Sequence, residues 1–233
     1  METIDRQSVA ASIDVNVLRA YVQRVYAWMG GGLLITAVVA YAVSNSEPVM
    51  SAIYGTPLRW LFLFAPLGMV FYLSSRIDKM QPSTAAGMFI AFATLMGVSI
   101  SYIFLVYEMG SIFQVFMIAS GMYAGAAVYG YTTKRDLTSM GSFLFMGLIG
   151  LVIAVVVNMF MQSDMMSFII SVIGVLIFTG LTAWDMQKIK SQAVVMFAGE
   201  GLATKRAIVG ALSLYLNFLN LFLFLLRLLG DRR

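Results

Sequence analysis

Long apolar segments alternate with short polar breaks along almost the whole chain. A helix that crosses a bilayer needs about 20 mainly apolar residues. Seven segments meet this length: Val25–Ser44, Pro57–Leu73, Ala85–Val106, Ile112–Tyr131, Met140–Met161, Ser167–Met186 and Ile208–Leu229. The breaks contain Pro, Asn, Asp and Ser, which end helices and form turns. Because backbone polar groups in lipid must be paired within their own segment, the pattern predicts an all-α bundle of seven transmembrane helices.

The first 24 residues are polar enough to form an N-terminal tail, which leaves residues 25–230 as one transmembrane domain. Within the tail, the apolar residues Val17, Leu18, Tyr21 and Val22 recur at helical spacing. This spacing predicts a short amphipathic helix lying on the membrane surface. Alternatively, the same residues extend the first transmembrane helix.

The composition supports a membrane protein and excludes several kinds of chemistry. The chain is 61% hydrophobic and 11% charged, whereas soluble domains are typically about 45–50% apolar and about 25% charged. It contains no Cys and no His. Disulfides, thiol nucleophiles, Ser-His hydrolysis and metal sites built on Cys or His are therefore excluded. Proton chemistry would have to use carboxylates, Lys or Tyr.

The distribution of positive charge predicts the orientation. With a cytoplasmic N-terminus, 11 of the 15 Lys and Arg residues lie in cytoplasmic segments. The positive-inside rule therefore favours this orientation. Three of the remaining four, Arg227, Arg232 and Arg233, lie at the C-terminus. Either the C-terminus is outside despite these arginines, or the last segment is re-entrant and returns it to the cytoplasm.

Small residues recur at four-residue spacing in two of the predicted spans. The pairs are Ala93 with Gly97, Gly97 with Ser101, and Gly121 with Gly125. Small residues at this spacing allow helix backbones to approach closely, which lipid itself does not drive. We expect these pairs to lie at helix–helix contacts; the alternative is a hinge or a substrate passage.

Asp185 is the single acidic residue of the chain that falls inside a predicted span. It lies near the end of the sixth span, where the negative pole of its own helix and partial burial both disfavour an ionised carboxylate. Its partner could be Lys188, one turn further on, or Arg76 or Arg206 at neighbouring helix ends. One interpretation is a simple interfacial ion pair with Lys188. The other is a gate or an ion pathway, since an intramembrane charge is a functional candidate by default.

Two asparagines mark one face of the seventh span. Asn217 and Asn220 are three residues apart, so they share a helix face. A polar stripe on an otherwise apolar helix indicates that this face is turned toward other helices rather than lipid. We therefore expect the seventh helix to be central.

Four stretches of the chain stand out: YAWMGGGLLITAVVAY at 26–41, GYTTKRDL at 130–137, IGVLIFTGLTAWDMQKI at 173–189 and LSLYLNFLNLF at 212–222. With these stretches the chain resembles the Bax inhibitor-1 family, also called the transmembrane Bax inhibitor motif family, in its bacterial inner-membrane members. The resemblance implies seven helices with the last one wrapped by the other six. It also implies a pH-sensitive calcium leak, in which calcium is cargo and no cofactor is bound.

The resemblance further implies a gate made of two aspartates on the sixth and seventh helices, latched by an arginine at the end of the second. Asp185 matches the first aspartate and Arg76 the arginine, but the second aspartate position is occupied by Asn217. Without the second carboxylate there is no like charge beside Asp185, and the amide can donate to its ionised form. Our hypothesis is that pH gating here is weakened or shifted to lower pH. Supporting polar contacts are expected from Lys188, Arg206 and Asn220.

Two functional classes remain open, and a third is disfavoured. The chain is either a cation leak gated near Asp185 or a regulatory protein that binds a membrane-bound quality-control protease or another membrane protein. An enzyme is not expected, because an intramembrane aspartyl protease needs two membrane aspartates and the spans hold one. Nucleic acid is not an expected partner, since the few positive charges cluster beside the spans.

Overall fold

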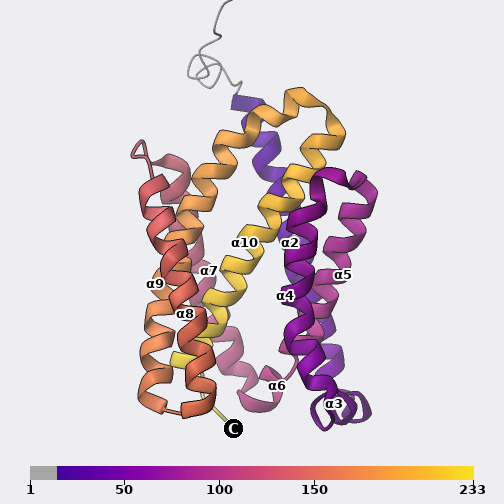
Figure 1. Cartoon of the computed structure of the whole chain (residues 1–233), viewed down its shortest axis with the longest axis vertical. Helices are drawn as coiled ribbons and strands as arrows, with labels where there is room; N and C mark the ends of the chain where they lie inside the picture. The colour runs from indigo at the N-terminus through magenta and orange to yellow at the C-terminus, as the bar shows by residue number, and fades with distance from the viewer. Residues whose placement is uncertain (1–14) are drawn as a thin grey trace, which may run out of the picture. The chain divides into compact units, whose positions relative to one another are not determined.

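The computed structural model describes residues 15–233 and is built from α-helices (Figure 1). Seven helical segments in this part of the chain are long and apolar enough to cross a membrane, as the sequence predicts. Their main helices are α2 (Val15–Ser44), α4 (Leu58–Arg76), α5 (Pro82–Ile100), α7 (Met109–Thr132), α8 (Thr138–Met161), α9 (Asp164–Ser191) and α10 (Glu200–Leu229). Shorter pieces join them: α3 (Glu47–Tyr54), η1 (Ile77–Lys79), α6 (Ile103–Val106) and η2 (Gln192–Ala198).

The first helix is longer than its apolar segment. α2 runs without a break from Val15 to Ser44, so the residues expected to form a surface helix are continuous with the first span. Tyr21 and Val25 in this stretch are fully buried. Burial of both residues means that the stretch packs against protein. Residues 1–14 of the predicted tail lie outside the described part of the chain.

The chain forms two compact units. Unit 1 contains the segment up to Leu105 together with residues 189–212, and unit 2 contains residues 106–188 and 213–233. In unit 1, α5 packs against both α2 and α4. Here the expected small-residue contact is confirmed: the Thr36 hydroxyl donates to the Ala93 carbonyl at 2.9 Å, and a Cβ on Gly97 would lie 2.8 Å from the Thr36 carbonyl oxygen.

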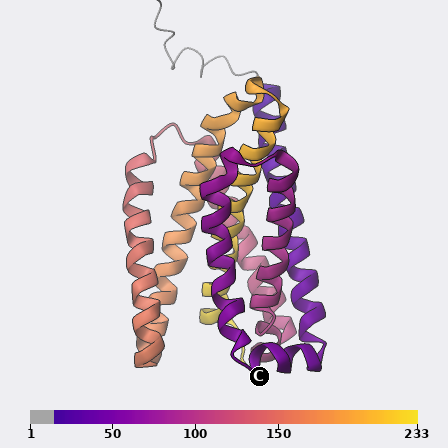
Figure 2. The ribbon, with the colours of Figure 1, turned by 45° about the vertical axis from the view of Figure 1, so that its right-hand side comes forward.

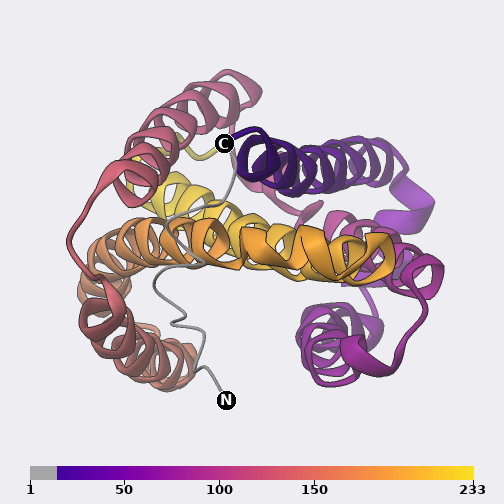
Figure 3. The same cartoon turned by 90° about the horizontal axis from the view of Figure 1, so that it is seen from above.

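In unit 2, α8 and α9 form an antiparallel pair joined by a two-residue turn (Figures 2 and 3). Leu144 of α8 contacts α9 at Gly180, where an added Cβ would overlap the leucine side chain. The expectation for Gly121 and Gly125 of α7 is wrong, because a Cβ on either would meet no heavy atom of the unit within 4 Å. Both glycines are exposed, so small-residue spacing alone did not indicate a contact.

The last helix, α10, is the most buried of the seven and packs against other helices, as expected. In its most apolar window 67% of the residues are buried, whereas no other helix exceeds 39%. Its first part, up to Leu212, belongs to unit 1 and the remainder belongs to unit 2. η2 and Gly199, whose φ of 104° suits glycine, precede its first residue.

The C-terminal residues are attached to unit 2. The Glu108 N–H donates to the Asp231 carbonyl at 3.1 Å and the Arg233 N–H donates to the Val106 carbonyl at 3.0 Å. Because α10 is a continuous helix, it does not turn back as a re-entrant segment would. The C-terminus therefore lies at the end of unit 2 where α7 begins, beside Tyr107.

Candidate functional site

Asp185 and Asn217 are in direct contact in unit 2. The Nδ2 atom of Asn217 donates a hydrogen bond to Oδ2 of Asp185 at 2.8 Å, joining α10 to α9. Asn217 is 5% exposed, and Asp185 is partly exposed. A buried polar group needs a hydrogen-bond partner, and in this apolar part of the unit each of the two side chains supplies the partner of the other. The two positions that the family resemblance matches to its aspartate pair are therefore adjacent.

The α9 segment that carries Asp185 is fixed by two glycines on neighbouring helices. Gly130 of α7 lies against the backbone of Ala183, and Gly141 of α8 lies against the ring of Trp184. A Cβ on either glycine would overlap these atoms, so only glycine allows this separation of the helices. The two contacts lie directly before Asp185 in the chain. They set the position of the carboxylate along α9.

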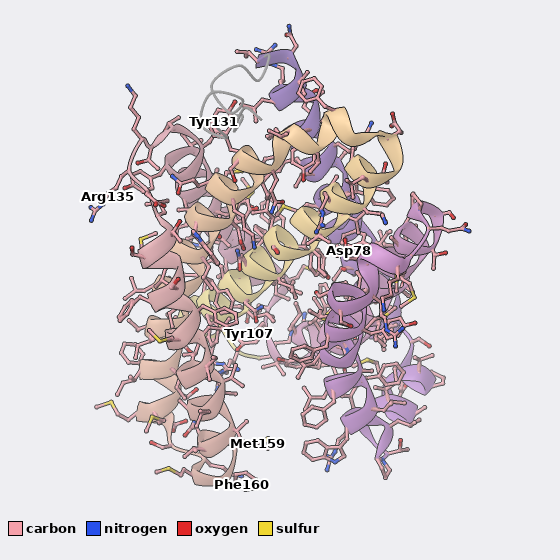
Figure 4. The ribbon with its side chains drawn as sticks, turned by 45° about the horizontal axis from the view of Figure 1, so that its top comes forward. Asp78, Tyr107, Tyr131, Arg135, Met159 and Phe160 are labelled. Atoms are coloured by element: carbon pink, nitrogen blue, oxygen red, sulfur yellow. The ribbon has the colours of Figure 1, made fainter. Side chains whose placement is uncertain are left out.

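Gln187 fixes α9 to the connection between α7 and α8. Its Oε1 accepts from the Leu137 N–H at 2.9 Å, and its Nε2 donates to the Arg135 carbonyl at 2.8 Å. Arg135 projects from this loop (Figure 4). In the same loop, Asp136 accepts hydrogen bonds from the side chain and the backbone N–H of Thr138, and these hold the pKa of the Asp136 carboxyl below its usual range.

Aromatic rings surround the α10 turn that carries Asn217. Phe218, the next residue, packs edge-to-face on Tyr123 at 5.5 Å between ring centroids and on Phe116 at 5.4 Å. Both rings come from α7. Asn220, expected as a supporting residue, donates instead to the Leu216 carbonyl of its own helix at 2.8 Å. Of the two asparagines, Asn217 is therefore the one that reaches another helix.

The predicted basic residues have separate surroundings. In unit 2, the Lys188 ammonium lies 5.3 Å from the Trp184 ring centroid. In unit 1, Arg206 pairs with Asp78 at 3.0 Å. Arg76 is the last residue of α4 and is exposed; it also belongs to unit 1, whereas Asp185 belongs to unit 2.

The site has few groups that could hold a metal ion. Within residues 15–233 no cluster of three or more His, Cys, Asp or Glu side chains could bind one. Calcium takes about six to eight oxygen ligands, and the Asp185–Asn217 pair offers one carboxylate and one amide. The pair alone therefore supplies fewer oxygen ligands than calcium takes.

Sequence reasoning found the polar pair but missed the contacts that position it. Gln187, Gly130 and Gly141 were not among the expected site residues, although Gln187 and Gly130 lie in stretches that carry the family resemblance. Gln187 follows Asp185 by two residues, and a polar side chain at this end of the span could have indicated a contact with a loop. The glycine contacts depend on which helices are neighbours, which the sequence does not state.

Comparison with known proteins agrees with the fold. Residues 18–233 match the family model described as Inhibitor of apoptosis-promoting Bax1. The inner membrane protein YbhL of Escherichia coli is 41% identical over 224 residues, covering 93% of each chain. An uncharacterized protein of Rickettsia prowazekii, RP147, is 44% identical over 216 residues, covering 93% of this chain and 91% of its own.

A third relative, an uncharacterized protein of Borreliella burgdorferi, is 41% identical over 221 residues, covering 94% of this chain and 95% of its own. None of these names describes a catalytic activity. The match thus extends over nearly every helix, including α9 and α10 with the Asp185–Asn217 contact. The chain is an integral membrane protein and belongs to the Bax inhibitor-1 family.

Proposed function

We propose that this protein is a cation leak, with calcium as a carried ion, whose gate is the contact between Asp185 and Asn217. The observation that carries the proposal is the 2.8 Å hydrogen bond between α9 and α10. A charged or polar side chain inside a membrane protein marks an ion or proton pathway by default. A single hydrogen bond between two helices can open and re-form at a cost of about 1 kcal/mol, which suits a gate.

The surroundings of Asp185 support a gate of defined position. Gly130 and Gly141 hold the preceding two residues of α9 in place, and Gln187 holds the following turn to a loop. The carboxylate is therefore held at one position along α9, and opening of the gate would break its hydrogen bond to Asn217. Lys188, three residues after Asp185 on the same helix, is proposed as the supporting cation of the gate.

The proposed pH response follows from the single carboxylate. Two facing carboxylates share a proton and titrate as a pair. Here the partner is an amide, which does not titrate, so protonation of Asp185 alone would break or weaken its acceptor role. We expect a weaker pH response than in a member with two aspartates.

The proposed setting is the bacterial cytoplasmic membrane with the N-terminus in the cytoplasm. The relative YbhL is named as an inner membrane protein. The excess of Lys and Arg in the segments that would then be cytoplasmic supports the orientation. It would place the carboxyl end of α9, with Asp185, on the cytoplasmic side.

The test is calcium influx into proteoliposomes at pH 6, 7 and 8 for the wild type, Asp185→Asn and Asn217→Asp. We expect the wild type to leak above empty liposomes. Asp185→Asn should change the leak and remove its pH dependence, and Asn217→Asp should strengthen that dependence. Asn220→Ala is the matched control, because Asn220 bonds its own helix, and it should behave as the wild type.

The alternative is a regulatory protein that binds a membrane-bound protease or another membrane protein. If neither the wild type nor Asn217→Asp differs from empty liposomes, the leak proposal fails and regulation becomes the function to pursue. Deletion of residues 1–20 separates the two: lost regulation with intact flux supports binding, and the reverse supports transport.

A further inference from the structure

Unit 1 contains a cavity that the proposed function does not use. It has a volume of about 160 Å³ and is lined by Tyr54, Arg59, Trp60, Phe62, Leu63, Ser99 and Tyr102. It lies where α4 begins and α5 ends, so α3, α4 and α5 meet there at one end of the unit (Figure 1). Pockets for whole small molecules usually measure about 300–1,000 Å³. This cavity can therefore hold one end of a larger ligand.

Two hydroxyl groups of the cavity, those of Tyr54 and Ser99, are already engaged by backbone carbonyls. Tyr54 donates toward the carbonyl of Val98 at 2.9 Å, at the carboxyl end of α5. The Ser99 hydroxyl is bonded to carbonyl groups of Phe62 and Leu95. These bonds satisfy carbonyls near a helix end and join α3 and α4 to α5. Neither hydroxyl has its hydrogen available for a ligand.

Arg59 is the one charged residue among the seven that line the cavity. Its guanidinium lies 5.3 Å from the centroid of the Trp60 ring. Within residues 15–233 the guanidinium has no ion-pair or hydrogen-bond partner, and Arg59 is exposed. Stacking on the ring orients the guanidinium while its N–H groups stay available for an anion.

One side of the lining is apolar and aromatic and faces outward. Trp60 is 44% exposed, Leu63 55% and Tyr102 39%. Trp and Tyr gather where membrane helices pass the lipid headgroups. A ligand that satisfies this cavity therefore carries a single anionic group for Arg59 and an apolar remainder that runs along α4 past Leu63. A membrane glycerophospholipid has this chemistry.

We propose that this cavity is a phospholipid site, in which Arg59 binds the phosphate and Trp60 and Leu63 contact the glycerol and the upper acyl chain. Arg is suited to the phosphate because its planar fork can donate two parallel hydrogen bonds. The site is independent of Asp185 and Asn217, which belong to the other unit.

The test is native mass spectrometry of the purified full chain in detergent, titrated with dioleoylphosphatidylglycerol and, separately, with dioleoylglycerol, which lacks the phosphate. We expect one molecule of dioleoylphosphatidylglycerol to bind each chain more tightly than further molecules do. Arg59→Gln should weaken the affinity of this tight site by about three- to tenfold. Arg59→Lys should restore part of the affinity. The control is Arg227→Gln: Arg227 lies 5.8 Å from the Phe224 ring in unit 2, outside the cavity, and its loss should leave the tight site unchanged.

Three results would overturn the proposal. One is equal binding of dioleoylglycerol and the phospholipid, which would mean that the phosphate is not recognised. Another is equal weakening by Arg59→Gln and Arg227→Gln, which would indicate nonspecific charge attraction. The third is displacement of the lipid by millimolar inorganic phosphate, which would make the cavity a small-anion site. Unchanged thermal unfolding of Arg59→Gln checks that the variant is folded.

Discussion

The hydrogen bond between Asp185 and Asn217 should contribute measurably to the stability of unit 2. Hydrogen bonds to a charged group typically contribute about 1.5–3 kcal/mol in soluble proteins. Between membrane helices, double-mutant cycles average about 0.6 kcal/mol and reach about 1.7 kcal/mol. The bond is short, at 2.8 Å, and Asn217 is buried, but Asp185 is partly exposed, so water competes for the carboxylate. We therefore expect a coupling free energy of about 1 kcal/mol.

The assay is a double-mutant cycle with Asp185→Ala, Asn217→Ala and the double variant, with the free energy of unfolding measured by SDS titration in mixed micelles. The cycle isolates the pairwise energy from the cost of the cavities that the alanines leave. Asp185→Asn is a useful comparison, because its amide oxygen still accepts from Asn217 and should retain part of the coupling. Asn220→Ala combined with Asp185→Ala should be additive. A coupling below about 0.3 kcal/mol, within the usual error of additivity, would refute the reasoning.

Two other predictions concern the contacts that position Asp185. Gly130→Ala should destabilise the protein by about 1–3 kcal/mol, because the new methyl group would overlap the α9 backbone. Gly125→Ala on the same helix, where nothing lies within 4 Å, should be neutral or slightly stabilising in the same SDS titration, and an equal loss in both would contradict the packing argument. Gln187→Leu removes both bonds to the loop at residues 133–137. Amide hydrogen exchange in that loop should become faster, whereas exchange at the far turn of α8 and α9 should not change.

The span count was predictable because bilayer thickness and backbone hydrogen bonding leave few alternatives for seven apolar segments. The helix ends were harder. α2 begins at Val15, ten residues before the predicted span, and α10 begins at Glu200 rather than Ile208. In both cases, polar residues continue the helix beyond the apolar segment. Hydropathy does not register such extensions, since they are held by polar contacts such as the 2.8 Å ion pair between Arg24 of α2 and Glu200 of α10 in unit 1.

Asp185 and Asn217 were predictable as a site because polar side chains in apolar spans must find partners, and few such residues are present. Their positioning depends instead on which helices are neighbours. Gly130 and Gly121 are both small residues of α7, yet one touches Ala183 and the other meets no atom of its unit. The sequence of α7 alone therefore does not distinguish the glycine that contacts a neighbouring helix from the one that does not. A carboxylate that must stay in place while its hydrogen bond breaks needs contacts that hold its own helix rigidly. Substitution of Gly130 or Gln187 should therefore change ion flux through the proposed gate, even though the contacts of these residues are to other parts of α9 and its loop and not to the Asp185 carboxylate.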